Sequence, residues 1–188
     1  LVLEEKVYDL GEAWRAANGR KRAPEWVDGG LASALPSWTK VRSEIERFAG
    51  AAAKHAGTAK LKPLRNAESK LALPFQPRII FCAAANYSEH AKEMGSDLAK
   101  KSESKPYFFL KVENCANGPF DAVRLPPEVQ KLDWEVELSA VIGRTAWRVD
   151  KVKALDYVAG YMVGNDVTAR DLNVRTDFPF KYDWFQGK

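Results

Sequence analysis

Apolar and polar residues alternate most regularly between Leu132 and Ala140. Apolar side chains fill every second position there, and most of the positions between them are acidic. Side chains of a strand point alternately to its two faces. The pattern therefore predicts a strand with its apolar face on a core and with Glu135 and Glu137 together on the other face. The Cα atoms of these glutamates would be about 7 Å apart. Unneutralised carboxylates this close repel each other, so that face either lies in water or holds a positive group.

Weaker patterns divide the rest of the chain into two portions. Residues 1–73 are rich in Ala and Lys, and apolar residues at three- and four-residue steps predict one amphipathic helix over 37–56. Residues 74–188 form a β-rich portion, for which we expect strands over 78–83, 106–112, 132–140 and 160–167, short helices over 86–95 and 151–158, and an exposed polar loop over 96–105. Short strands and helices without regular βαβ units favour the α+β class.

The composition is that of an ordinary globular protein. Hydrophobic residues make up 46% of the 188 residues, which is enough for a core, and no apolar run approaches the ~20 residues of a membrane span. The 29 basic and 25 acidic residues are interspersed, so the net charge of +4 does not predict a nucleic-acid interface. Two cysteines give no disulfide framework and fit a reducing compartment, from which we predict the cytoplasm.

A third carboxylate changes the interpretation of the acidic strand. By itself, a pair of glutamates on one strand face is typical of a stripe exposed to solvent. Asp166, however, ends an apolar run at the point where a strand is predicted to become a turn. Carboxylate oxygens suit hard cations such as Mg²⁺, Mn²⁺ or Ca²⁺. Glu135, Glu137 and Asp166 together therefore indicate a candidate metal site.

Several motifs in the second portion resemble those of the fumarylacetoacetate hydrolase family. They are "LDWEVELSAVIGR", "ALDYVAGYMVGNDVTARDL" and "WFQGK", and upstream "CAAANYSEHAKEMG" is similar to the family's stretch at that place. The resemblance runs from about Pro77 to Lys188. It implies a catalytic domain with a mixed β-sandwich or roll that continues beyond residue 188, and it places the family's metal ligands on Glu135, Glu137 and Asp166.

The resemblance also implies roles for residues whose chemistry is ambiguous. His90 and Glu93, three apart in a predicted helical turn, correspond to the family's water-activating pair, although a surface pair has the same spacing. Lys188 corresponds to an active-site lysine. Lys111 and Tyr87 are candidates for substrate binding, with a surface lysine and a structural tyrosine as the alternatives.

Two further expectations concern the turn around Asp166. Arg170 and its neighbour Asp171 are expected to pair with each other in a structural role. Asn165 is expected to orient the Asp166 carboxylate from behind the metal site.

From these features we expect a metal-dependent hydrolase that cleaves a carbon–carbon bond in a small acidic dicarbonyl compound of the acylpyruvate or fumarylpyruvate type. Water activated by His90 and Glu93 would attack, and the leaving enolate would be held by the cation and Lys188. An isomerase or decarboxylase of a related keto acid could use the same apparatus, and a non-catalytic ligand-binding module is a further alternative. The resemblance also implies a homodimer that binds a small carboxylic acid.

Overall fold

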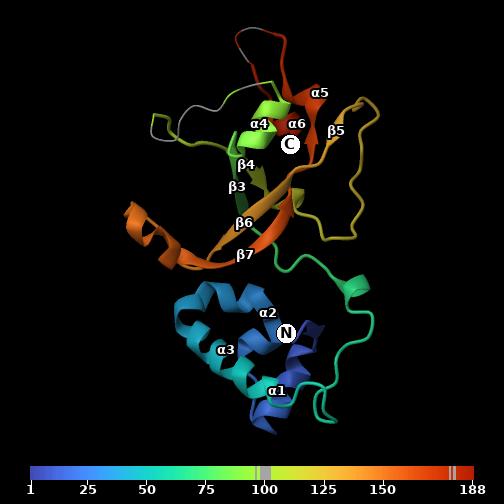
Figure 1. Cartoon of the computed structure of the whole chain (residues 1–188), viewed down its shortest axis with the longest axis vertical. Coiled ribbons are helices and arrows are strands. Elements are labelled where there is room, and N and C mark those ends of the chain that lie inside the picture. Colours follow the sequence, from blue (N-terminus) through green and yellow to red (C-terminus); the bar gives the residue numbers. More distant parts are fainter. Residues whose placement is uncertain (96, 98–102, 178, 180) are drawn as a thin grey trace. The chain divides into compact units, whose positions relative to one another are not determined.

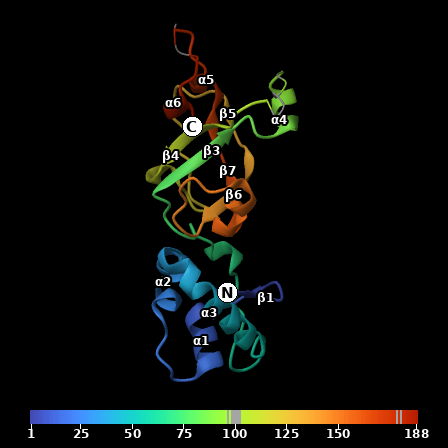
Figure 2. The same cartoon turned by 90° about the vertical axis from the view of Figure 1, so that its left-hand side faces the viewer.

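The structure, a computed structural model, describes residues 1–95, 97, 103–177, 179 and 181–188 (Figures 1 and 2). The polar loop predicted over 96–105 lies largely outside the described residues. The chain divides into two compact units, each described here by itself. They consist of Leu1–Phe75 with Gly118–Asp121 and Glu137–Gly164, and of Gln76–Asn117 with Ala122–Val136 and Asn165–Lys188.

Three helices of the first unit pack around an aromatic cluster (Figures 1 and 2). The rings of Trp14 and Trp26 meet edge to face, with centroids 5.7 Å apart, and both lie within 5.5 Å of the Phe48 ring. Burial of such rings supplies much of the stability of a small core. The helices are α1 (Leu10–Asn18), α2 (Glu25–Ala34) and α3 (Trp38–Ala53).

The predicted amphipathic helix corresponds to α3, whose Phe48 and Ala52 are buried. The two helices before it are not predicted by the sequence analysis. Asp9 starts α1 by accepting a hydrogen bond from the Glu12 N–H at 2.8 Å, which satisfies one of the free donors of the first turn. Positive φ at Gly30 (58°) interrupts α2 near its middle.

Paired short strands and short helices make up the second unit. β3 (Ile79–Ala84) pairs antiparallel with β4 (Tyr107–Val112), with α4 (Ser88–Glu93) between them in the chain. β5 (Leu132–Asp133) pairs antiparallel with β8 (Thr168–Ala169). α5 (Arg170–Asn173) follows β8 directly, and α6 (Trp184–Gly187) contacts α5, β4 and β8.

A third strand pair joins the segments on either side of the candidate metal ligands. It consists of β6 (Val136–Ile142) and β7 (Val158–Asn165). The smaller elements are β1 (Val2–Leu3), β2 (Lys6–Val7) and the 3₁₀ helices Leu35–Ser37, Glu68–Lys70, Glu113–Cys115 and Lys151–Tyr157. This mixture of helices and strands confirms the α+β class. No helix in the described part of the chain is long and apolar enough to cross a bilayer.

The faces of the alternating stretch are not covered as predicted. Its apolar side chains are exposed in this chain, Trp134 to 75% and Val136 to 66%. The Glu135 side chain is only 13% exposed, because side chains of α5 and Lys188 surround it. The two faces are therefore distinct, as the alternation predicts, but the prediction that the apolar face lies on a core is wrong for the described residues.

Candidate active site

Backbone contacts bring the segments of Glu135 and Asp166 together. The Asp166 N–H donates to the Glu135 carbonyl oxygen at 2.8 Å, and the Glu135 N–H donates to Asn165 Oδ1 at 3.0 Å. Asn165 therefore holds the Glu135 backbone, whereas the sequence analysis expected it to orient the Asp166 carboxylate. These two hydrogen bonds fix the spacing of two acidic residues that are far apart in sequence.

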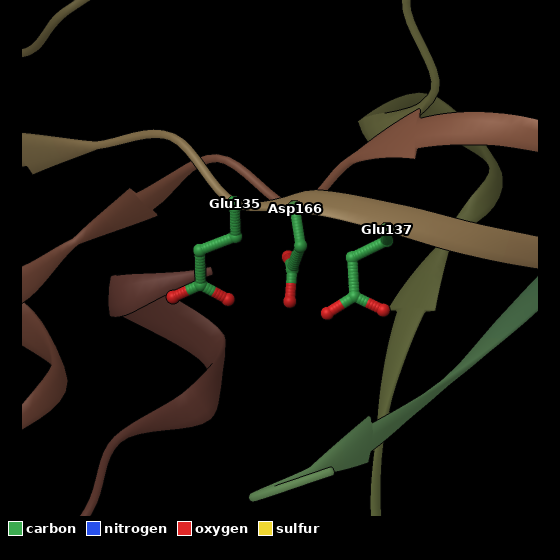
Figure 3. A group of neighbouring side chains, drawn as sticks. All are labelled: Glu135, Glu137 and Asp166. Carbon is green, nitrogen blue, oxygen red and sulfur yellow. The ribbon is translucent and has the colours of Figure 1, made fainter. Parts of the chain in front are cut away.

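Figure 3 shows the side chains of Glu135, Asp166 and Glu137 pointing to the same side of the strand and the turn. One oxygen from each carboxylate lies within 4.8 Å of the others. The residues predicted as metal ligands are thus neighbours in space, as a shared cation requires. The site already contains positive charge of its own, however.

Lys188 supplies a cation between two of these carboxylates. Its Nζ donates to Asp166 Oδ2 at 2.9 Å and to Glu135 Oε2 at 3.1 Å, and its side chain is only 4% exposed. Because an ammonium bridges the two acids, they do not need a divalent ion to lie close together. A metal ion placed between the same oxygens would have to displace Lys188 or share them with it.

Lys111 approaches the other oxygen of Asp166. Its Nζ lies 2.5 Å from Asp166 Oδ1 and donates to the Val167 carbonyl at 3.2 Å. The ammonium is not aligned for a hydrogen bond to Oδ1, and this buried oxygen has no aligned donor among the described residues. The Lys111 ammonium thus already supplies a positive charge at this buried oxygen, and a further cation bound there would have to share the oxygen with it.

Arg170 binds residues that the sequence analysis did not assign to it. Its Nε donates to Asp133 Oδ2 at 2.8 Å, and its Nη2 donates to Glu135 Oε1 and lies 3.1 Å from His90 Nε2. The expected pairing with Asp171 is therefore wrong, since the Asp171 carboxylate accepts from the Gln130 N–H instead. The bond from Arg170 lowers the pKa of Asp133, which stays ionised beside the site.

The predicted water-activating pair is loosely assembled on α4. His90 Nδ1 lies 3.7 Å from Glu93 Oε2, and Glu93 is largely exposed. The other ring nitrogen, Nε2, lies 3.7 Å from Glu135 Oε1, so His90 reaches the acidic cluster. Tyr87, at the start of α4, is 39% exposed and accepts through its carbonyl from the Ala91 N–H. Its assignment to substrate binding stays a prediction.

Close packing of α6 against α5 positions Lys188. A Cβ atom at Gly187 would lie 2.5 Å from the Asn173 Cα, so only glycine fits between these backbones. Asp183 starts α6 by accepting from the Phe185 N–H at 3.1 Å and the Gln186 N–H at 3.0 Å. Lys188 follows this short helix directly, so Asp183 and Gly187 together place its side chain on the acids.

Acid is expected to loosen this helix. The N–H of Gln186, together with the Arg175 guanidinium and the N–H of Phe185, holds the pKa of Asp183 below its usual value near 3.9. A lowered pKa in the folded state means that the stabilisation is complete above the unfolded-state pKa and is lost as the pH falls through the folded-state pKa. The melting temperature should therefore be level above about pH 5 and fall below about pH 4.

Thermal unfolding of wild type and Asp183→Asn across this pH range tests the expectation. The variant should melt lower at neutral pH and lose less stability on acidification. The melting temperature of the variant should still fall somewhat in acid, because hydrogen bonds also lower the pKa of Asp171 and Asp177. Parallel curves for the two proteins would show that Asp183 does not contribute to the acid sensitivity.

Comparison with known proteins decides the family. Residues 79–188 match the model described as fumarylacetoacetate (FAA) hydrolase C-terminal. The chain belongs to the fumarylacetoacetate hydrolase family. All eight residues with a predicted site role lie inside the matched range.

Two relatives in this family are 36% and 41% identical to the chain over the residues that align. A fumarylacetoacetate hydrolase domain-containing protein 2 homolog of Dictyostelium discoideum is 41% identical over 126 residues, which cover 67% of this chain and 38% of that protein. The human protein named oxaloacetate tautomerase FAHD2A, mitochondrial, is 36% identical over 137 residues, which cover 72% of this chain and 41% of that protein. The matched region thus spans about two fifths of the length of these relatives.

A solved structure supports the family fold over nearly the whole chain. The crystal structure of an HpcE-type protein from Mycobacterium smegmatis is 27% identical and aligns with a TM-score of 0.62. The alignment covers 97% of this chain and 56% of that one. The fumarylacetoacetate hydrolase fold is therefore present here, as the sequence motifs predict.

The residues present fit a hard divalent cation. Glu135, Glu137 and Asp166 offer only carboxylate oxygens, the ligands that Mg²⁺, Mn²⁺ and Ca²⁺ prefer, and one oxygen of each lies within 4.8 Å of the others. The sequence analysis missed Arg170 and Asp133 as members of the site. The contacts of Arg170 with Glu135, Asp133 and His90 span 35 to 80 residues, so no local pattern could have indicated them.

Proposed function

We propose that this protein catalyses proton transfer on a small 2-oxo dicarboxylic acid and so interconverts its keto and enol forms. Oxaloacetate is the substrate that best fits the proposal, because a relative 36% identical to the chain is named an oxaloacetate tautomerase. The proposal favours isomerisation, which the sequence analysis gave as its first alternative, over carbon–carbon bond hydrolysis.

The positions of one imidazole and one ammonium provide the main support. His90 Nε2 lies 3.7 Å from Glu135 Oε1, and Lys188 Nζ lies 3.1 Å from Glu135 Oε2. A proton acceptor and a positive donor are therefore held at the two oxygens of a single carboxylate. Enolisation needs these two groups, one to take a proton from carbon and one to stabilise the oxygen that becomes negative.

The proposed reaction moves one proton and leaves the composition of the substrate unchanged. His90 takes a proton from the carbon next to the keto group, and the C–H electron pair becomes the carbon–carbon double bond of an enolate. Lys188 donates a hydrogen bond to the enolate oxygen, which takes up a proton from water to give the enol, and His90 releases its proton to water. In the reverse direction, His90 returns the proton to carbon. Glu93 lies beside the Nδ1 side of the ring, where a carboxylate favours an imidazole with its proton on that nitrogen.

Glu135, Glu137 and Asp166 would hold the cation in this scheme, Mg²⁺ or else Mn²⁺ or Ca²⁺. When bound, the ion would supply Lewis acidity that polarises the keto group and makes the neighbouring C–H more acidic. The same three residues would keep the ion next to the side chains that move the proton.

Deuterium uptake tests the proposal directly. The protein, with Mg²⁺ or Mn²⁺ added, is incubated with oxaloacetate in heavy water, and ultraviolet absorbance follows the enol while mass spectrometry follows the substrate. Catalysed loss of the enol and faster deuterium incorporation at carbon, without fragmentation, are the expected results. No acceleration over a sample without protein would overturn the proposal.

Hydrolysis is the second candidate, because His90 and Glu93 are neighbours on α4 as a water-activating pair would be. The distance between His90 Nδ1 and Glu93 Oε2 is long for such a pair, at 3.7 Å. An acylpyruvate or fumarylpyruvate substrate separates the reactions by mass. Hydrolysis gives two fragments that together carry one added water, decarboxylation loses CO₂, and isomerisation keeps the mass. A ligand-binding module without catalysis would leave every substrate unchanged.

Replacing His90 should lower turnover without affecting ion binding. His90→Gln keeps the side chain polar but removes the proton acceptor, so kcat is expected to fall by about 100-fold, within the range for loss of a general base. The affinity for Mn²⁺, measured by calorimetry, should change less than threefold or so, because His90 is not among the carboxylate ligands.

The second histidine of the chain provides a matched control. His55 lies in the first unit, and His55→Gln should leave kcat and Mn²⁺ affinity at the wild-type values. A collapse of Mn²⁺ affinity in His90→Gln would mean that His90 is an ion ligand. Unchanged turnover in that variant would mean that another group takes the proton.

Two further expectations stay predictions. The homodimer can be checked by the mass of the protein in solution. The cytoplasmic location was predicted from the cysteine content, whereas the human relative is named a mitochondrial protein, so localisation of the full-length protein in cells is the relevant measurement.

A further inference from the structure

We propose that Arg170 is a positioning residue that fixes the His90 ring with Nε2 as the nitrogen that accepts a proton. The inference rests on the proposed function for its catalytic meaning, but its structural content can be tested separately. Arg170 Nη2 lies 3.1 Å from His90 Nε2, which is hydrogen-bonding distance.

The chemistry of the two side chains decides which nitrogen carries the proton. A guanidinium has only N–H donors and stays charged in proteins, so it can bond only to an acceptor. His90 Nε2 must therefore present its lone pair to Arg170. The neutral ring then carries its proton on Nδ1, the nitrogen that lies 3.7 Å from Glu93 Oε2. The opposite tautomer would place two donors face to face.

Other carboxylates hold the guanidinium in place. Arg170 Nε and Nη2 both lie 2.8 Å from Asp133 Oδ2, and Nη2 also donates to Glu135 Oε1. The Arg170 side chain is 18% exposed, so water competes little for these bonds. Two acids anchor the cation, and the cation in turn orients the imidazole across 80 residues of sequence.

One nitrogen atom of Arg170 thus serves both the imidazole and a predicted metal ligand. Because Nη2 donates to Glu135 as well as to His90, the guanidinium stays anchored to the carboxylate when another group takes its place at His90 Nε2. Arg170 would therefore present Nε2 in the unprotonated form and release it when substrate arrives. In this role it acts through His90 and does not touch the reacting carbon.

Nitrogen-15 NMR of the imidazole rings tests the inference in the protein without substrate. With labelled histidine, long-range proton–nitrogen spectra distinguish the two tautomers, and His55→Gln identifies the His90 signals because the chain has only two histidines. The neutral His90 ring is expected mainly as the Nδ1–H tautomer. A wild-type spectrum dominated by the Nε2–H tautomer would overturn the inference, whatever reaction the enzyme catalyses.

Variants separate positioning from simple structural support. Arg170→Met removes the donor and should shift His90 toward the Nε2–H tautomer, while Arg170→Lys keeps a donor and should retain part of the Nδ1–H population. kcat should fall about 10- to 100-fold in Arg170→Met, as for other residues that orient an active group, with KM changed less. An unchanged tautomer in folded Arg170→Met would contradict the inference.

A surface arginine gives the control. Arg42 pairs with Glu46 at 2.9 Å on an exposed helix face, and Arg42→Met should change neither the His90 spectrum nor kcat. Failure of the proposed isomerisation would show in the activity measurements alone and would leave the tautomer result standing. If Arg170→Met does not fold, the wild-type spectrum still decides the question.

Discussion

Glu135→Gln is expected to abolish ion-dependent turnover, with a loss on the order of 1,000-fold. Glutamine keeps the shape of the side chain but removes the negative charge that faces Lys188, Arg170 and the proposed ion. It takes away one of three carboxylates whose oxygens lie within 4.8 Å of one another. Calorimetric titration with Mn²⁺ should show strongly weakened binding, and added Mn²⁺ should no longer stimulate the reaction.

The control for this variant is Glu46→Gln, which removes an exposed carboxylate paired with Arg42. It should bind Mn²⁺ and turn over as wild type does. Circular dichroism of Glu135→Gln and Glu46→Gln should be recorded to check that both variants are folded. This check is needed because a buried cation that loses its partner can cost about 3–5 kcal/mol of stability. Persistent Mn²⁺-stimulated turnover in folded Glu135→Gln would remove the acidic cluster from the mechanism.

Lys188→Met should change ion binding and turnover in opposite directions. The Lys188 ammonium bridges Glu135 and Asp166, so in its absence an incoming divalent ion no longer competes with it for these oxygens, although Arg170 and Lys111 still pair with the two acids. We expect Mn²⁺ affinity to rise about tenfold, equivalent to about 1.4 kcal/mol. Turnover should fall about 100- to 1,000-fold, because the donor to the enolate oxygen is lost.

The expected rise in Mn²⁺ affinity of Lys188→Met can be measured independently of catalysis. Calorimetry gives the affinity directly, and the melting temperature should rise with added Mn²⁺ because ligand binding stabilises the folded state. Lys60→Met, at an exposed position of the first unit, is the matched control and should resemble wild type. Weaker Mn²⁺ binding in Lys188→Met would mean that the lysine supports the ion and does not compete with it. Unchanged turnover would exclude Lys188 from the chemistry.

Local patterns in the sequence were sufficient for the pairing of Glu135 with Glu137 and for several elements, but not for the third acid. The two-residue period brings Glu135 and Glu137 to one strand face, and the family motif adds Asp166. The three-to-four-residue period found α3. The short helix predicted over 151–158 is present as a 3₁₀ helix, and Asp150 Oδ1 caps it by accepting from the Val152 N–H at 3.2 Å. The shared strand face, the helix period and the cap each depend on residues only a few positions apart, so they can be predicted from a single sequence.

Long-range contacts could not be predicted in this way. Alternation shows that two strand faces differ, but packing decides which one is covered, and here the acidic face at Glu135 is the covered one. Nothing near Arg170 in the sequence indicates that its partners are Asp133 and His90. Helix α1 is only nine residues long and α2 is interrupted at Gly30, so neither presents a long periodic stretch, and tertiary packing of Trp14 and Trp26 helps to stabilise them.

The lysine bridge has a consequence for the protein when ions are scarce. Many metal sites unfold when stripped by a chelator, because repelling ligands are then left with nothing between them. In this chain Lys188 lies between Glu135 and Asp166, and Arg170 and Lys111 add further positive charge to the same two acids. Chelation should therefore switch the catalyst off while the polypeptide stays folded, and returning the ion should restore the rate without any refolding step.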